Sequence, residues 1–282
     1  MPKRKRLFTE EKKNKLIKEG RGSGIGSEYI PWITIQDVSS KGRSTRLKGI
    51  KTNRQHEFLS DMERDYFYIL EYLDDVIDIR EQYPLLPIEE TILIAQELGI
   101  KHPQDPRTKE PIVMTTDFVI TIKEKNGNID VARTIKSYDD LMNNRVLEKF
   151  EIEKRYWKKH DIDWGVVTEK EINKVFAKNI SYAHNYYTLN QLDSLGEIDH
   201  EILEDMILSY ISRLLKENDT IRNISNNFEK DFMLMKGTGI AIFRYLIINK
   251  VIQVNLFEPI NVNEKIKVDI IENRVNRELK IL

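Results

Sequence analysis

The chain contains no cysteine among its 282 residues. This absence excludes disulfides, thiolate metal sites and cysteine nucleophiles together, and it fits a cytoplasmic protein without requiring one. No apolar run approaches the roughly 18 residues that a membrane helix needs. The basic residues 1–6 have no apolar segment behind them, so they are not expected to be a secretory signal. We therefore predict a cytoplasmic protein with no membrane partner.

Several catalytic signatures are missing as well. The five histidines are scattered without paired ligand spacing, which argues against a zinc site. No Gly-x-Ser-x-Gly elbow is present to support a serine triad. The glycine-rich residues 20–26 follow no predicted strand and precede no Gly-Lys-Ser/Thr, so they are not a nucleotide-binding loop of known type. A flexible loop whose backbone approaches a phosphate is favoured over a plain linker.

The net charge of −1 hides an uneven distribution. Basic residues dominate between positions 3 and 51, whereas acidic residues gather later, as in 74–78 and 197–204. A basic arm on a neutral protein indicates either a polyanionic partner or a solvated tail, and charge alone leaves both open.

A predicted hairpin organises the chain. Two runs rich in β-branched residues, 115–120 and 131–136, flank an Asn-Gly pair, which is a strong turn signal. Because side chains alternate across a strand, Asp117 should share a face with Val119. The hairpin would then hold the Asp117 carboxylate and the Lys136 ammonium side by side at the ends of neighbouring strands.

An amphipathic helix is predicted over residues 58–73, with Ser60 or Asp61 as its cap. Glu63 lies about 100° from its neighbour Met62, at the edge of the apolar stripe. A carboxylate there either projects into a cleft as a metal ligand or reaches water as an ordinary flanking residue. The helix pattern does not decide between these two alternatives.

The remaining elements predict an α/β unit with a mixed sheet, followed by a mainly helical unit. In the first unit we expect a strand at 76–86, helices at 88–99 and from 137 or 139 to 158, a short basic helix at 10–18 and a strand at 163–168. In the second we expect helices at 198–218, 220–227 and 237–249, then strands at 251–257 and 266–271. The boundary is predicted at 168–171, giving domains 1–169 and 170–282. Three helices and a terminal hairpin are typical of a winged-helix module, although helical bundles share that outline.

Carboxylate chemistry is what these residues could perform. A phosphodiester repels an anionic nucleophile; two acidic side chains holding Mg²⁺ neutralise that charge and lower the pKa of bound water. A nearby lysine orients the water and stabilises the developing charge. Glu63, Asp117 and Lys136 have these types, in the order helix, strand, strand. Their spacing follows the PD-(D/E)xK nuclease pattern in outline, but Thr134 stands where a carboxylate commonly sits.

Many short blocks between residues 18 and 173 resemble the TnsA-type endonucleases, which are subunits of heteromeric cut-and-paste bacterial transposases. The blocks are Lys18–Gly22, Tyr29–Trp32, Leu59–Glu63, Asp78–Gln82, Gly99–Pro103, Met114–Phe118, Leu147–Lys149, Arg155–Trp157 and Lys170–Asn173. This resemblance implies a restriction-endonuclease-like fold, dependence on Mg²⁺ with Mn²⁺ as a substitute, and cleavage at the 5′ ends of a transposon.

The resemblance also implies roles for individual residues. Glu63, Asp117 and Lys136 are expected to be catalytic, and the two carboxylates to hold the metal. Either the Thr134 side chain or the Ile135 carbonyl would complete the metal site. Glu153 matches a helix glutamate near the family's active site and is a secondary candidate. Contact with DNA is expected from basic side chains at Arg21, Lys41, Arg43, Arg46, Lys101 and His102.

The partners implied are double-stranded DNA at transposon ends, a TnsB-like transposase and a TnsC-like AAA+ ATPase that contacts the C-terminal domain. Two alternatives stay open at this point. One is a non-catalytic DNA-binding or docking protein with a nuclease-like shell, which Thr134 would favour. The other is a different PD-(D/E)xK nuclease, such as a restriction enzyme or junction resolvase.

Overall fold

The computed structural model describes residues 8–37, 43–189, 195 and 198–271. The chain divides into two compact units, residues 1–172 and 173–282. The predicted domain boundary, after residue 169, lies three residues before this division. Within the described ranges no helix is both long and apolar enough to cross a membrane.

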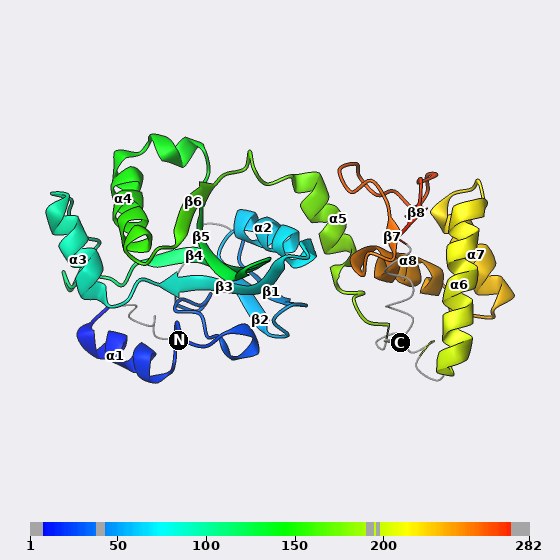
Figure 1. Ribbon diagram of the computed structural model, residues 1–282, viewed down its shortest axis with the longest axis horizontal. Coiled ribbons are helices and arrows are strands. Elements are labelled where there is room, and N and C mark those ends of the chain that lie inside the picture. The colour runs from blue at the N-terminus through cyan, green and yellow to red at the C-terminus, as the bar shows by residue number, and fades with distance from the viewer. Residues whose placement is uncertain (1–7, 38–42, 190–194, 196–197, 272–282) are drawn as a thin grey trace. The chain divides into compact units, whose positions relative to one another are not determined.

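The first unit is built on a four-stranded mixed sheet in the order β3-β4-β5-β6 (Figure 1). The strand β4 is antiparallel to both β3 and β5, and β6 runs parallel to β5. The predicted hairpin is confirmed as β4 and β5, with Gly127 at its tip in the left-handed conformation that the turn requires (φ 130°). The strands are β3 Val76–Pro84, β4 Thr115–Glu124, β5 Gly127–Ile135 and β6 Asp163–Val167.

Helices cover both faces of this sheet, α2 on one side and α3 with α4 on the other (Figure 1). On the α2 side, Phe67 packs with Phe118 of β4. On the opposite side, Trp157 of α4 packs with Val119 of β4 and Ala132 of β5. Burial of apolar side chains on both faces explains why Phe118, Val119 and Ile120 form a continuous apolar run in the central strand β4. The helices are α1 Glu10–Lys18, α2 Asp61–Tyr72, α3 Ile88–Glu97 and α4 Asn144–Lys159.

In this unit one predicted helix start was wrong, one hairpin was missed, and the glycine-rich segment is more closely packed than expected. The helix expected from 137 or 139 is a short 3-10 turn, Asp139–Met142, and α4 begins only after Asn143, whose side chain accepts from Arg145 N–H and caps the helix. The hairpin of β1 Thr45–Lys48 and β2 Gln55–Phe58 was missed. The glycine-rich segment is a packed turn, because a Cβ on Gly22 (φ 76°) would lie 2.2 Å from Pro84 Cγ.

The second unit is mainly helical, as predicted, with one helix that was missed. Phe176, Ala177, Ile180 and Ala183 recur at helical spacing behind the Asn173 cap, so the signal for α5 was present in the sequence. The strands are only two residues each, and the winged-helix assignment therefore stays a prediction. The elements are α5 Lys174–His184, α6 His200–Lys216, α7 Ile221–Asp231, α8 Thr238–Ile248, β7 Ile252–Gln253 and β8 Asp269–Ile270.

Candidate active site

Glu63 is held at the first turn of α2 by a reciprocal cap. Its N–H donates to the Ser60 hydroxyl at 3.2 Å, and that hydroxyl donates back to Glu63 Oε1 at 2.7 Å. The Leu59 N–H donates to the second carboxylate oxygen at 3.1 Å. These bonds orient the side chain inward, and only 7% of the residue is exposed. Glu63 is therefore not the flanking glutamate in water that the sequence left open.

Gln82 joins the two carboxylates, a role that sequence reasoning missed. Its side-chain amide donates to Asp117 Oδ1 at 3.1 Å and also approaches Glu63 Oε2 at 3.5 Å. Thr115 donates its hydroxyl to the Gln82 carbonyl oxygen at 3.2 Å, which fixes the amide orientation. A single amide nitrogen within reach of both groups shows that Glu63 and Asp117 face one another, although they are 54 positions apart in sequence.

The regular alternation of side chains along β3 is interrupted at Gln82, whose backbone has a positive φ of 50°. Residues two apart in a regular strand share a face, yet Glu81 contacts His56 of β2 while the Tyr83 ring packs in a tilted arrangement with Trp157 of α4. The paired strand follows the same change: Thr116 binds Trp157, whereas Phe118 packs on the α2 side.

This irregularity corrects the predicted facing of Asp117. Val119 packs toward α4, but Asp117 shares Gln82 with Glu63 of α2. Strict alternation predicted that Asp117 and Val119 lie on one face. The prediction failed because alternation holds only for regular strands, and β4 pairs here with β3 on either side of Gln82, a non-glycine residue with positive φ.

The pKa values of Glu63 and Asp117 are both raised. Burial and then the neighbouring Asp117 raise the pKa of Glu63 to about 7. Burial also raises the pKa of Asp117, opposed by the Ile135 N–H, which donates to Asp117 Oδ2 at 2.7 Å, by Gln82 and by Lys136. Two close carboxylates that both favour protonation form a site that a divalent cation would stabilise.

Lys136 follows directly after β5, beside this pair. Its N–H donates to the Val167 carbonyl at 3.0 Å, and its ammonium lies 3.4 Å from Asp140 Oδ2. The side chain is 37% exposed, so it is open to a substrate. Its charge lowers the pKa of Asp117, so it acts on the same carboxylate as Gln82. The structure therefore brings together the three residues predicted to be catalytic.

Glu153 and Thr134 form a second polar cluster behind the first. Glu153 Oε1 accepts from Thr116 at 2.6 Å, from Trp164 Nε1 at 3.0 Å and from the Thr134 hydroxyl. Burial raises the pKa of Glu153 to about 7, and Asp117 adds to this against the hydroxyl hydrogen bonds. The Thr134 hydroxyl thus donates to Glu153, and its role as a metal ligand stays a prediction.

The two facing carboxylates are ligands of a type that magnesium takes. Within the described residues, no group of three or more His, Asp or Glu side chains is placed to hold a metal ion. The Glu63–Asp117 pair offers two carboxylates, and Mg²⁺ is commonly bound through one or two carboxylates together with water and substrate phosphates.

Two of the residues predicted to contact DNA, His102 and Arg21, make hydrogen bonds within the protein. His102 is buried; its Nδ1 donates to the Pro103 carbonyl at 3.0 Å, and its Nε2 lies 2.9 Å from the Thr91 hydroxyl. This position contradicts a role for His102 in DNA contact. Arg21 binds Asp37 Oδ2 at 2.6 Å and the Trp32 carbonyl at 3.1 Å, and only 18% of its side chain is exposed. Its contact with DNA remains a prediction.

The other predicted DNA contacts lie at the surface or outside the described ranges. Lys101 and Arg43 are exposed. Arg46, on β1, pairs with Glu57 at 2.7 Å while 44% of its side chain stays exposed. Lys41 lies outside the described residues. These side chains remain candidates for backbone contacts.

Comparisons with known proteins match both units. Residues 73–169 match the family model described as TnsA-like endonuclease N terminal, and residues 171–256 match TnsA endonuclease C terminal. The chain is also 38% identical over 267 residues to the Escherichia coli protein named "Transposon Tn7 transposition protein TnsA", covering 94% of this chain and 93% of that protein. Two matched units and an almost complete alignment lead to one conclusion: the chain belongs to the TnsA family of transposon endonucleases.

Proposed function

We propose that the chain is the Mg²⁺-dependent endonuclease subunit of a cut-and-paste transposase and hydrolyses phosphodiester bonds at the 5′ ends of the transposon. The observation that carries the proposal is the inward-facing pair of Glu63 and Asp117, joined by Gln82 and flanked by Lys136. The printed name of the Escherichia coli relative places that protein in Tn7 transposition, which supports the biological setting.

Each residue has a distinct role in this proposal. Glu63, Asp117 and the main-chain carbonyl of Ile135 would hold Mg²⁺, which supplies charge neutralisation and an acidified water when bound. Lys136 orients the attacking water and stabilises negative charge on the phosphate. Gln82 fixes the two carboxylates in facing positions. Glu153 anchors the ends of β4 and β5 through Thr116 and Thr134. Because its pKa is raised to about 7, it would also accept a proton near neutral pH.

The partners proposed are double-stranded transposon ends, a TnsB-like transposase that cuts the 3′ ends and a TnsC-like AAA+ ATPase. The second unit, residues 173–282, would contact the ATPase. A subunit of this kind is expected to be nearly silent until its partners deliver the DNA.

The test is strand cutting by the complete transposition complex with an Asp117→Asn subunit. Loss of 5′-end cutting by at least about 1,000-fold, with 3′-end cutting retained, is expected because the substitution removes a metal ligand. Asp163→Asn is the matched control, because Asp163 is an exposed aspartate at the sheet edge that pairs with Arg133. Full 5′-end cutting by the Asp117→Asn complex would disprove the proposed function.

A further inference from the structure

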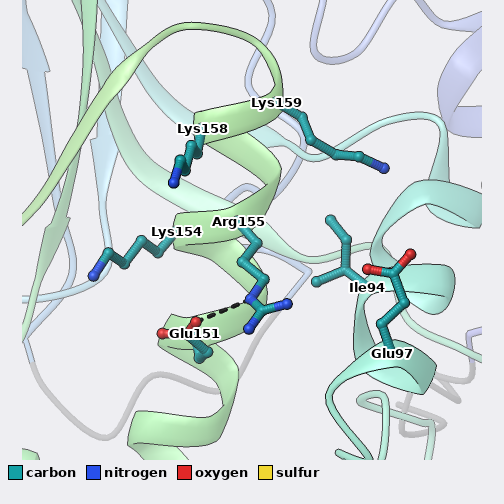
Figure 2. Close-up of a pocket in the computed structure, with 7 residues that line it drawn as sticks. All are labelled: Ile94, Glu97, Glu151, Lys154, Arg155, Lys158 and Lys159. Atoms are coloured by element: carbon teal, nitrogen blue, oxygen red, sulfur yellow. Dashed lines mark hydrogen bonds and ion pairs between the residues drawn. The ribbon is translucent and has the colours of Figure 1, made fainter.

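A groove with an excess of positive charge lies between α3 and α4, outside the carboxylate site. Its volume is about 520 Å³. Ile94 and Glu97 of α3 form one side, and α4 contributes Glu151, Lys154, Arg155, Lys158 and Lys159. Figure 2 shows Lys159 of α4 extending toward the side of Ile94 and Glu97 of α3, whereas Lys154 and Lys158 project on the other side of α4.

The groove carries more cations than its own acids neutralise. Four lining side chains are basic and two are acidic. Arg155 is paired with Glu151 at 3.0 Å, as the dashed line in Figure 2 shows. Lys154, Lys158 and Lys159 have no ion pair among the described residues that is recorded at 4.0 Å or less. The whole chain has a net charge of −1, so this concentration is local to α4.

The groove is connected to the active site through α4 itself. Glu153, whose carboxylate binds Thr116 and Thr134 at the ends of β4 and β5, immediately precedes Lys154 in the helix. A rise of about 1.5 Å per residue places Lys158 only about 7.5 Å along the axis from Glu153. The sheet face that α3 and α4 cover is opposite the face that α2 covers, so a polyanion bound in this groove would lie on the other side of the sheet from Glu63.

We propose that this groove binds the phosphate backbone of duplex DNA on the face of the first unit that α3 and α4 cover. The inference rests on the proposed function, since it takes the substrate to be DNA, and it adds a contact surface that none of the predicted DNA-contact residues occupies. The basic stretch from Lys154 to Lys159 spans about 7.5 Å, or roughly two nucleotides of axial rise. Charge complementarity, without base-reading groups in the groove, makes this contact independent of sequence.

The first test compares duplex binding by the full-length chain and by its Lys154→Gln/Lys158→Gln/Lys159→Gln variant, in EDTA so that no cutting occurs. Fluorescence anisotropy with a 30-base-pair duplex should show at least tenfold weaker binding at about 50 mM salt. The slope of log affinity against log salt should fall by up to about 2.7, because each lost phosphate contact removes about 0.9. Lys123→Gln/Lys125→Gln, at the exposed hairpin tip, is the control and should change neither value.

The second test uses the absence of cysteine in the chain. A photo-crosslinker attached to Glu151→Cys should crosslink to the duplex, whereas the same reagent on Glu124→Cys at the hairpin tip should not. Thermal unfolding of the triple variant separates folding from binding. Wild-type affinity and salt slope in a folded triple variant would overturn the inference, as would absence of wild-type binding. Defective regulation with unchanged duplex binding would overturn it in favour of an acidic protein partner. Duplex binding that is retained while the complete transposition complex shows no metal-dependent 5′-end cutting would instead disprove only the proposed function.

Discussion

Two buried acids on the same side of the sheet have opposite electrostatics. Glu81 is fully buried and Glu63 is 7% exposed. Burial alone would raise both pKa values, but His56 and Arg54 lower the pKa of Glu81 to about 2. Glu63 faces Asp117 instead, and its pKa rises to about 7. Burial therefore does not distinguish a structural carboxylate from a functional one; the charge of its neighbour does.

The two environments are adjacent along one strand. Glu81 accepts from Arg54 Nη1 at 2.8 Å and lies 2.8 Å from His56 Nδ1, so its negative charge is matched inside the fold. The next residue, Gln82, turns to the carboxylate pair. A charge left unmatched in the protein is costly unless a ligand supplies the opposite charge, and perturbed acids in such positions are typical of functional sites.

The largest expected effect on stability comes from replacing Glu81, whose negative charge is matched by Arg54 and His56. Glu81→Gln leaves the Arg54 guanidinium buried without its carboxylate and should lower the free energy of unfolding by about 3–5 kcal/mol. Urea unfolding at pH 7 measures this loss. The double variant Glu81→Leu/Arg54→Met, which removes both charges, should recover a substantial part of it. An unchanged midpoint in Glu81→Gln would show that the pair is not needed for folding.

Replacing Glu63 by glutamine should raise the free energy of unfolding, whereas the same replacement of Glu81 lowers it. Because the folded pKa of Glu63 is raised, its cost to stability is absent below its usual pKa and complete above about pH 7. Without metal, Glu63→Gln should therefore raise the free energy of unfolding by up to about 2 kcal/mol at pH 8 and have little effect at pH 4. Destabilisation at pH 8 would show that the cap to Ser60 and Leu59 outweighs the repulsion.

Metal binding should depend on pH in the same range. Below about pH 7 the carboxylate pair keeps a proton that Mg²⁺ must displace, so affinity should rise with pH up to that value and then level off. Calorimetry in buffers of different ionisation enthalpy should detect release of about one proton at pH 6 and almost none at pH 9. Proton release that is equal at both values would mean that Glu63 is not a ligand.

The smallest expected effect concerns the Lys136–Asp140 ion pair, in which both side chains are partly exposed. Such pairs contribute about 0–1 kcal/mol, so Asp140→Asn should alter stability little. Freed from this partner, Lys136 should increase 5′-end cutting by about twofold to fivefold in the complete complex. Asp139→Asn is the neighbouring control. A decrease with Asp140→Asn would indicate that Asp140 positions the lysine for catalysis.

Sequence reasoning proposed Glu63, Asp117 and Lys136 from their residue types, from their helix–strand–strand order and from the family resemblance. It did not identify Gln82, since an amide in a strand carries no pattern that marks it as a bridge. It offered either the Thr134 side chain or the Ile135 carbonyl as a metal ligand, and it did not foresee that the Thr134 hydroxyl binds Glu153 of α4. His102 was selected as a basic loop residue, but packing against Thr91 buries it.

The sequence by itself determined the hairpin, most helix positions and the acids available for catalysis, because turn residues and apolar periodicity act over a few residues. Only the tertiary structure decided which acids meet, because Glu63, Gln82 and Asp117 come from three separate elements. It also decided which charges are matched, giving Arg54 and His56 to Glu81 and leaving Glu63 with Asp117. Long-range electrostatics depends on distances that no sequence spacing fixes.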